Sequence, residues 1–130
     1  MSLVINPRDI APPFSRYAHG ILSPEGCRWL HVSGQVGVRP DGTMAMTPEA
    51  QLEQAFANLL AVLAEAGMER EHLVKLNVFL TRRDDIGLYR TVRDRVLEGQ
   101  ETASTLLVVA ALASPDFLVE IDAVAAAPSV

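Results

Sequence analysis

Residues 48–66 read PEAQLEQAFANLLAVLAEA, and this stretch decides how the rest of the chain is interpreted. Its large apolar side chains recur three and four positions apart, which is the spacing of one helix face. Thr47 is a suitable N-cap, Pro48 stands where a helix needs no backbone N–H, and Gly67 is a suitable stop. We therefore predict an amphipathic helix from about Pro48 to Ala66, with one apolar face that must pack against another layer.

The patterns that follow this helix alternate between strand and helix. Residues 74–80, VKLNVFL, alternate as a strand does, and one face is expected to carry Val74, Leu76, Val78 and Leu80. The later patterns predict a helix from Asp84 or Asp85 to about Leu97, a strand at 105–112 and a strand at 117–125.

Two further strands are predicted in the first third of the chain. They cover residues 17–23 and 27–38, and the turn Pro24-Glu25-Gly26 separates them. Residues 27–38 are either a strand pair or one bent strand interrupted at Gly34, and residues 39–42, Arg-Pro-Asp-Gly, follow them with a turn. This arrangement predicts a hairpin-like opening to the fold.

The complete order of elements is ββαβαββ, which predicts an α+β sandwich with both helices on one face of the sheet. The run at 105–112 is apolar on both sides of its strand, so the uncovered face of the sheet would expose apolar side chains. Burial against other copies of the chain would remove this exposure, and we expect a homo-oligomer. The alternative is that loops or the N-terminal segment cover this face.

The chain has 130 residues, which suits a single domain over residues 1–130. Apolar residues make up 49% of it, enough to form a buried core. Lys and Arg number 11 and Asp and Glu 16, and the resulting net charge of −5 argues against nucleic acid as a partner. No export signal or membrane span is expected, and Cys27 is the only cysteine, so we expect a cytoplasmic protein.

Two carboxylates on the predicted last strand are candidates for acid–base chemistry. Glu120 and Asp122 lie two positions apart, which places both side chains on one face with their Cα atoms about 6–7 Å apart. Two carboxylates at that separation can serve in proton transfer. The alternative is a pair of structural charges near a sheet edge or a subunit boundary.

Three other polar patterns bear on the function. Ser33-Gly34-Gln35 predicts a bulge, which either presents backbone N–H groups to an anion or only bends the strand. The three histidines have no metal-ligand spacing, so no metal site is expected. Arg90, Arg93 and Arg95 lie on the predicted second helix, where a solvated charged face is expected.

Several segments, taken in order, resemble one family. They are residues 14–20 (FSRYAHG), 29–36 (WLHVSGQV), 65–67 (EAG), 74–80 (VKLNVFL) and 119–125 (VEIDAVA). The ordered set, which covers about residues 10–126, resembles the RidA/YjgF family, also known as L-PSP. The resemblance implies a chorismate-mutase-like fold, with two helices on one face of a mixed sheet, and a homotrimer with ligand pockets between its subunits.

Members of this family that are enzymes hydrolyse reactive enamines and imines to carbonyl compounds and ammonia. The resemblance implies that Glu120 is the catalytic residue and positions the attacking water. It also implies that Tyr17, Ser33 and Gly34 line the substrate-binding pocket. In the family, an arginine on the next-to-last strand binds the carboxylate of the substrate.

This chain departs from the family at that arginine. The family's Ala-Arg-Ser stretch aligns with residues 103–105, so Ser104 takes the place of the arginine, while Arg90 replaces a pocket asparagine. The loss of a bidentate arginine–carboxylate contact costs about 1.5–3 kcal/mol, or roughly 10- to 100-fold in binding. Either Arg90 or Arg16 substitutes for it, or the ligand is not an α-imino acid. In the second case the hydroxyls of Ser104 and Thr105 suit a neutral polar group.

We therefore predict a homotrimer that binds a small molecule between its subunits, needs no cofactor, and hydrolyses an imine or enamine of altered specificity. Standard 2-imino acid deaminase activity is expected to be weak or absent. The alternative is a non-catalytic trimer that binds a small ligand. Ribonuclease activity, which such proteins are also credited with, is disfavoured by the net charge of −5 and by the lack of a basic cluster.

Overall fold

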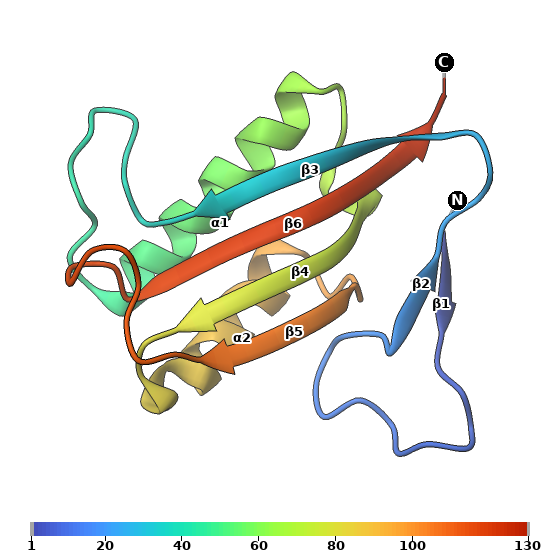
Figure 1. Cartoon of the computed structure of the whole chain (residues 1–130), viewed down its shortest axis with the longest axis horizontal. Helices are drawn as coiled ribbons and strands as arrows, with labels where there is room; N and C mark the ends of the chain where they lie inside the picture. Colours follow the sequence, from blue (N-terminus) through green and yellow to red (C-terminus); the bar gives the residue numbers. More distant parts are fainter. Residues whose placement is uncertain (1, 130) are drawn as a thin grey trace.

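The computed structural model describes residues 2–129 and shows a four-stranded sheet, a separate two-stranded sheet and two α-helices (Figure 1). The elements are β1 (Leu3–Ile5), β2 (Gly20–Leu22), β3 (Cys27–Gln35), α1 (Pro48–Glu65), the 3₁₀ turn η1 (Arg70–His72), β4 (Leu73–Leu80), the 3₁₀ turn η2 (Arg83–Asp85), α2 (Ile86–Val96), β5 (Ala103–Val108) and β6 (Val119–Pro128). The predicted α+β order is confirmed, with the short β1 added before it. No helix among the described residues is long and apolar enough to cross a membrane.

The strand order of the larger sheet explains why both helices lie on one side. The order is β3-β6-β4-β5, and β6 is antiparallel to both of its neighbours, whereas β4 and β5 are parallel. Strands β3, β4 and β5 therefore point the same way, and α1 and α2 make the crossovers between them. Both crossovers move in the same direction across the sheet, and such connections have one favoured hand. Both helices consequently cover the same face (Figure 1).

The first helix is capped at its start as its sequence predicts, and the predicted stop, Gly67, follows its end with a φ of 70°. At its start, the Thr47 hydroxyl accepts a hydrogen bond from the backbone N–H of Ala50 at 3.1 Å. At its end, the guanidinium of Arg28 donates to the carbonyl of Ala66 at 2.7 Å, and this places a positive charge at the negative end of the helix. The face that packs on the sheet is fully buried and consists of Gln51, Leu52, Ala55, Phe56, Leu59 and Leu63.

The opposite face of the larger sheet carries no helix (Figure 1). Trp29 and Leu107 point to this side and are 52% and 48% exposed. Polar side chains pair across it, since Asn77 donates to the carboxylate of Asp122 at 2.8 Å. Strand β5 ends at Val108, four residues earlier than predicted. This face is therefore a mixture of apolar and polar groups rather than a continuous apolar surface.

The prediction of a hairpin between the first two predicted strands was wrong. Strand β2 pairs with β1, where Leu3 lies opposite Leu22, and not with β3. The two paired strands form a small sheet beside one end of the main sheet (Figure 1). With only three residues, β1 is too short to produce a readable alternation, so the sequence pattern offered no partner for β2 other than β3.

The start of β4 also differs from the prediction. Leu73 is buried in the core, whereas Val74 is only half-buried. The reason is a register shift against β6 between Leu73 and Lys75. Because of this shift the side chain of Leu73, and not that of Val74, points to the core.

Gln51 holds two loops against α1 from inside the protein. Its side-chain amide donates to the carbonyls of Ala45 and Asp116 at 3.1 and 2.9 Å, and its oxygen accepts from the N–H of Leu118 at 2.8 Å. Gly37 leaves room for this residue, because a Cβ atom there would lie 2.7 Å from the Cα of Gln51. The loop before α1 and the loop before β6 are thereby fixed to the same point.

Candidate functional site

A cavity of about 230 Å³ lies where the N-terminal segment meets α2 and β5. Its lining consists of Phe14, Ser15, Tyr17, Tyr89, Arg90, Arg93, Ser104 and Leu106. Three of the predicted site residues, Tyr17, Arg90 and Ser104, are therefore brought together by segments that are far apart in the sequence.

The N-terminal segment is held against β5 by its backbone. The N–H of Ala18 donates to the carbonyl of Thr102 at 2.8 Å, and Ala18 forms a parallel bridge with Ala103 at the start of the strand. Both Ala18 and Thr102 are buried. This attachment places Tyr17 at the cavity, where its hydroxyl accepts a hydrogen bond from the N–H of Phe14 at 3.3 Å.

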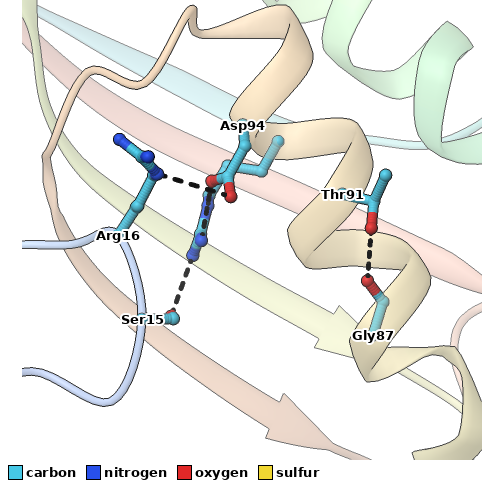
Figure 2. A network of polar contacts seen from close by, with 6 residues as sticks. Ser15, Arg16, Gly87, Thr91 and Asp94 are labelled. Atoms are coloured by element: carbon cyan, nitrogen blue, oxygen red, sulfur yellow. Dashed lines mark hydrogen bonds and ion pairs between the residues drawn. The ribbon is translucent and has the colours of Figure 1, made fainter.

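The expectation that Arg93 lies on a solvated helix face was wrong. Arg93 is only 4% exposed and borders the cavity. Its Nε donates to Asp94 Oδ1 at 2.9 Å, its Nη2 lies 2.8 Å from the same oxygen, and its Nη1 donates to the hydroxyl of Ser15 at 3.3 Å. Figure 2 shows Ser15 on the N-terminal segment, which passes beside α2, and Asp94 on that helix.

Tyr89 supplies the buried wall of the cavity. Its ring stacks on Phe56 of α1 with a centroid separation of 6.3 Å, and the guanidinium carbon of Arg93 lies 5.6 Å from its centroid. Burial raises the pKa of the Tyr89 phenol, although the charge of Arg93 and the neighbouring Ser104 hydroxyl act in the opposite direction. The hydroxyl of Tyr89 has no hydrogen bond of normal geometry within residues 2–129.

The two arginines that were predicted to replace the missing one occupy different positions. Arg90 is half-buried and lines the cavity, and its Nε is buried with no hydrogen-bond partner among the residues that the structure describes. Arg16 has a side chain that is 63% exposed and lies 3.8 Å from the carboxylate of Asp94, as Figure 2 shows. Arg16 is not part of the cavity lining.

The remaining predicted residues form a second group on the helix-free face of the sheet. Ser33 and Gly34 lie in an irregularity of β3, where the register against β6 shifts between Val32 and Gln35. The carboxylate of Glu120 lies directly over Gly34, since a Cβ atom at position 34 would be 2.6 Å from Glu120 Cδ. The predicted bulge at Gly34 is confirmed, and it makes room for this carboxylate.

The two groups are well separated within one chain. Ser104 lies opposite Leu76, and Leu76 lies opposite Ala123, three residues along β6 from Glu120. Ser104 and Glu120 are therefore about 10 Å apart along the strands and, at two strand spacings, about 10 Å apart across the sheet. Their side chains lie on opposite faces. Thr105 faces away from Ser104, and its hydroxyl accepts a hydrogen bond from Lys75 Nζ at 2.9 Å.

Sequence reasoning missed Phe14, Tyr89 and Arg93 as lining residues. A usable signal was present for Arg93, because it follows Tyr89 by four positions and therefore shares the apolar side of α2.

A larger cavity of about 850 Å³ lies between the small sheet and the main sheet, and none of the predicted site residues lines it. No group of three or more His, Cys, Asp or Glu side chains that could hold a metal ion was found within residues 2–129.

Comparison with known proteins places this geometry in a family. Residues 9–127 match the family model described as endoribonuclease L-PSP. The chain is 34% identical over 122 residues to protein DfrA of Myxococcus xanthus, covering 92% of this chain and 88% of that protein. It is 33% identical over 101 residues to the 2-iminobutanoate/2-iminopropanoate deaminase of Mus musculus, covering 75% and 73%.

A solved structure supports the same relationship. The crystal structure of YyfB from Yersinia pestis, described as a protein of unknown function of the conserved Rid protein family, matches with a TM-score of 0.86 and 29% identity. The match covers 95% of this chain and 97% of that one, so nearly the whole fold corresponds. With a family model that covers residues 9–127, this chain belongs to the RidA/YjgF family.

Proposed function

We propose that this protein is a homotrimer that hydrolyses a small imine or enamine in pockets between its subunits. The observation that carries the proposal is the carboxylate of Glu120, which lies over Gly34 on the helix-free face of the sheet. Family membership and the similarity to a mouse protein named as an imine deaminase support this reaction class.

The separation of the two groups of candidate residues supports a site between subunits. Glu120 and the cavity beside Ser104 lie on opposite faces of one chain, so one chain alone does not bring them to the same ligand. A neighbouring copy that packs on the helix-free face would bring its own residues to Glu120. The exposed side chains of Trp29 and Leu107 on that face would be buried by the same contact.

The proposed reaction needs one carboxylate and one water. Glu120 accepts a proton from the water as its oxygen attacks the carbon of the C=N bond, and it returns this proton to the nitrogen, which gives a carbinolamine. Glu120 then takes the hydroxyl proton as the C=O bond forms and passes it to the nitrogen. The C–N bond breaks with the electron pair leaving on nitrogen, and ammonia and a carbonyl compound are released.

The specificity is proposed to differ from that of 2-imino acid deaminases. Ser104 stands at the position where the resemblance expects an arginine, and no Lys or Arg follows Arg95 in the chain. Without that contact, a small α-imino acid would lose about 1.5–3 kcal/mol of binding, or roughly 10- to 100-fold. We therefore expect slow hydrolysis of 2-iminopropanoate relative to imines that lack an α-carboxylate.

Ammonia release from imines generated in the assay tests this proposal. 2-Iminopropanoate and an uncharged imine of similar size are supplied to the protein, to the Glu120→Gln variant and to the Asp122→Asn variant as a matched control. We expect turnover of the uncharged imine that Glu120→Gln reduces by about 10²-fold or more, as for loss of a general base, and that Asp122→Asn leaves largely intact. Turnover that survives Glu120→Gln would remove Glu120 from the reaction.

The second candidate function is a trimer that binds a small ligand without reaction. The same absence of a basic residue from β5 favours it, because the family's substrate contact is then missing. Under this function, a ligand raises the melting temperature of the protein but no imine is consumed. Absence of turnover for both imines, together with such a stabilising ligand, would favour binding over catalysis.

A further inference from the structure

The larger cavity lies between the small sheet and the end of the main sheet where β3 begins and β6 ends, two parts that Figure 1 shows side by side. Its volume of about 850 Å³ falls in the range of roughly 300–1,000 Å³ that is usual for small-molecule sites. It shares no lining residue with the smaller cavity beside α2. Ala126, which lines it, lies six residues along β6 from Glu120, about 20 Å away along the strand. The cavity is therefore separate from both groups of residues in the proposed function.

The walls of this cavity are apolar. Val4 and Ile21 lie opposite each other in the small sheet and both line the cavity, whereas Leu3 and Leu22 pair on the other face. Leu73 lines the cavity from the main sheet. Val4 is 48% exposed although it belongs to the wall between the two sheets. The sheets therefore do not fill the space between them, and an apolar group placed there would be removed from water.

The charged part of the lining is acidic. Glu69, Glu71 and Glu101 line the cavity, and neither Lys nor Arg does. Within residues 2–129, none of these three carboxylates forms an ion pair. Arg70, which stands between two of them in the sequence, pairs instead with Glu98 at 3.2 Å. The cavity therefore carries negative charge that no ion pair of the described residues neutralises.

Two of these carboxylates lie against each other at the turn η1. A hydrogen bond with Glu71, and then the charge of Glu71, raise the pKa of the Glu69 carboxyl. Nδ1 of His72 accepts a hydrogen bond from the backbone N–H of Glu69 at 2.9 Å, which holds the imidazole ring against the turn. A positively charged donor between the two carboxylates would relieve their repulsion and form charge-assisted hydrogen bonds with both.

The lining fits an ammonium group better than a metal ion. No group of three or more His, Cys, Asp or Glu side chains that could hold a metal was found in the part of the chain that the structure describes. An ammonium needs only oxygen acceptors, and it can be joined to a hydrocarbon body that covers the apolar walls. The negative lining disfavours carboxylates and phosphates, because like charges repel.

We propose that this cavity binds a small organic amine, whose ammonium contacts Glu69 and Glu71 and whose apolar body packs on the face of the small sheet that carries Val4. Glu101 adds to the negative potential of the same cavity. This site lies apart from the imine site proposed above, so the protein would bind two different ligands.

Binding of four small probes to the full-length protein tests the inference. Tryptamine joins an ammonium to an apolar ring, and tryptophol, in which a hydroxyl replaces the ammonium, is its uncharged counterpart. Indole-3-propanoate carries the opposite charge, and ammonium chloride is a cation with no apolar body. Binding is measured at constant ionic strength by calorimetry and by the rise in melting temperature that a ligand of the folded state produces. Tryptamine should bind about 10-fold more tightly than tryptophol, as expected for two exposed charge contacts.

Three charge variants locate the ammonium. Glu69→Gln and Glu71→Gln should each weaken tryptamine binding by about 3- to 5-fold, because both carboxylates are exposed and their contacts are screened. The double variant should weaken it by about 10-fold or more. Glu65→Gln is the control, because it removes one negative charge at an exposed position at the end of α1 and does not line the cavity.

Two further variants locate the apolar body. Val4→Ala should weaken tryptamine binding by about 3-fold, as expected when part of an apolar wall is lost. Leu3→Ala is the matched control, since Leu3 precedes Val4 in the same strand, points to the other face and is 58% exposed. All the substituted side chains are exposed, so the variants should fold, and their melting temperatures without ligand check this.

Each outcome supports or overturns the inference. Tryptamine binding that depends on Glu69, Glu71 and Val4, with weaker binding of tryptophol, supports it. Equal binding of tryptamine and tryptophol, preferred binding of indole-3-propanoate or ammonium chloride, equal weakening by Glu65→Gln, or no binding of tryptamine would overturn it. No measurement here requires imine hydrolysis, so this inference and the proposed function can fail separately.

Discussion

The carboxylate of Glu120 occupies the space beside Gly34 that a side chain at that position would need. A Cβ atom there would lie 2.6 Å from Glu120 Cδ and 2.9 Å from its Cγ. Glu120 comes from the last strand and Gly34 from the irregular end of β3, so the contact forms only when the two ends of the domain pair. The glycine therefore leaves free the space that the carboxylate occupies.

Substitution of Gly34 should move the carboxylate of Glu120 and have little effect on the stability of the fold. In Gly34→Ala, the new methyl group would force the carboxylate to rotate away, and the hydrolysis proposed above should fall by about 10-fold or more, as for a misplaced reacting group. The free energy of unfolding should change by less than about 1 kcal/mol, because the far end of a flexible side chain can move. Imine turnover and urea unfolding measure the two effects.

A glycine-to-alanine change elsewhere provides the control for that experiment. Gly87 lies on α2 with no atom within 4 Å of a Cβ placed on it, so Gly87→Ala meets no obstacle. It should leave turnover unchanged and stabilise the helix by up to about 1 kcal/mol. If Gly34→Ala behaves like Gly87→Ala in the turnover assay, the position of Glu120 does not matter to the reaction.

An arginine introduced at position 104 should change the specificity. Ser104→Arg restores a positive side chain on β5 and should increase hydrolysis of 2-iminopropanoate by about 10-fold or more. The new group would share the cavity with Arg90 and Arg93, so the variant should also be less stable. Combination with Arg93→Gln should recover stability, and urea unfolding of the single and double variants tests this coupling. An unchanged rate in both variants would contradict the assignment of position 104.

Loss of the Gln51 side chain should destabilise the fold strongly. Gln51→Leu leaves two loop carbonyls and one N–H without their partners inside the protein. Buried groups left unsatisfied cost about 1–3 kcal/mol each, and partial access to water should keep the total near about 3 kcal/mol. Gln54→Leu is the control, since the one side-chain hydrogen bond of Gln54 within residues 2–129 is to Asn58, one turn away on the same helix. Equal effects of the two substitutions on urea unfolding would show that the loops do not depend on Gln51.

Tyr89 should make the protein sensitive to alkaline pH. Burial raises the pKa of its phenol in the folded state, whereas in the unfolded chain it ionises near its ordinary value of about 10. Its contribution to stability is complete below pH 10 and is lost as the pH rises toward the folded-state pKa, because only the unfolded chain releases the proton. Melting temperatures measured from pH 8 to 11 should fall less steeply for Tyr89→Phe than for the parent protein. Identical slopes would contradict this role.

The fold could be predicted from the sequence where one periodicity dominates. The helix over 48–65 and the alternation of β6 were both readable, because Phe56, Leu59 and Ile121 recur at the spacing of a single buried face. The pairing of β2 was not readable, since its partner β1 has three residues and little pattern of its own. The register shift at Leu73 was missed for a similar reason, because a bulge breaks the period that the prediction used.

The candidate site was only partly accessible from the sequence. Glu120 and Gly34 were named by resemblance, and the close approach of one to the other emerged from the register of β3 against β6. Arg93 was predicted to lie on a solvated helix face, because charged side chains are normally exposed. Its burial depends on Ser15 and Tyr89, which approach it from a distant segment and from the preceding helix turn, and composition carries no information about such contacts.

Assembly should depend on the helix-free face of the sheet. Light scattering should give three times the mass of one chain, and Leu107→Glu should shift the protein toward single chains, because an unpaired carboxylate would have to be buried in the contact. Met46→Glu is the control, since Met46 is 81% exposed on the loop before α1 and outside that face. Dissociation should also abolish turnover if Glu120 needs residues of a neighbour, whereas a fully active single chain would show that one copy contains the complete site.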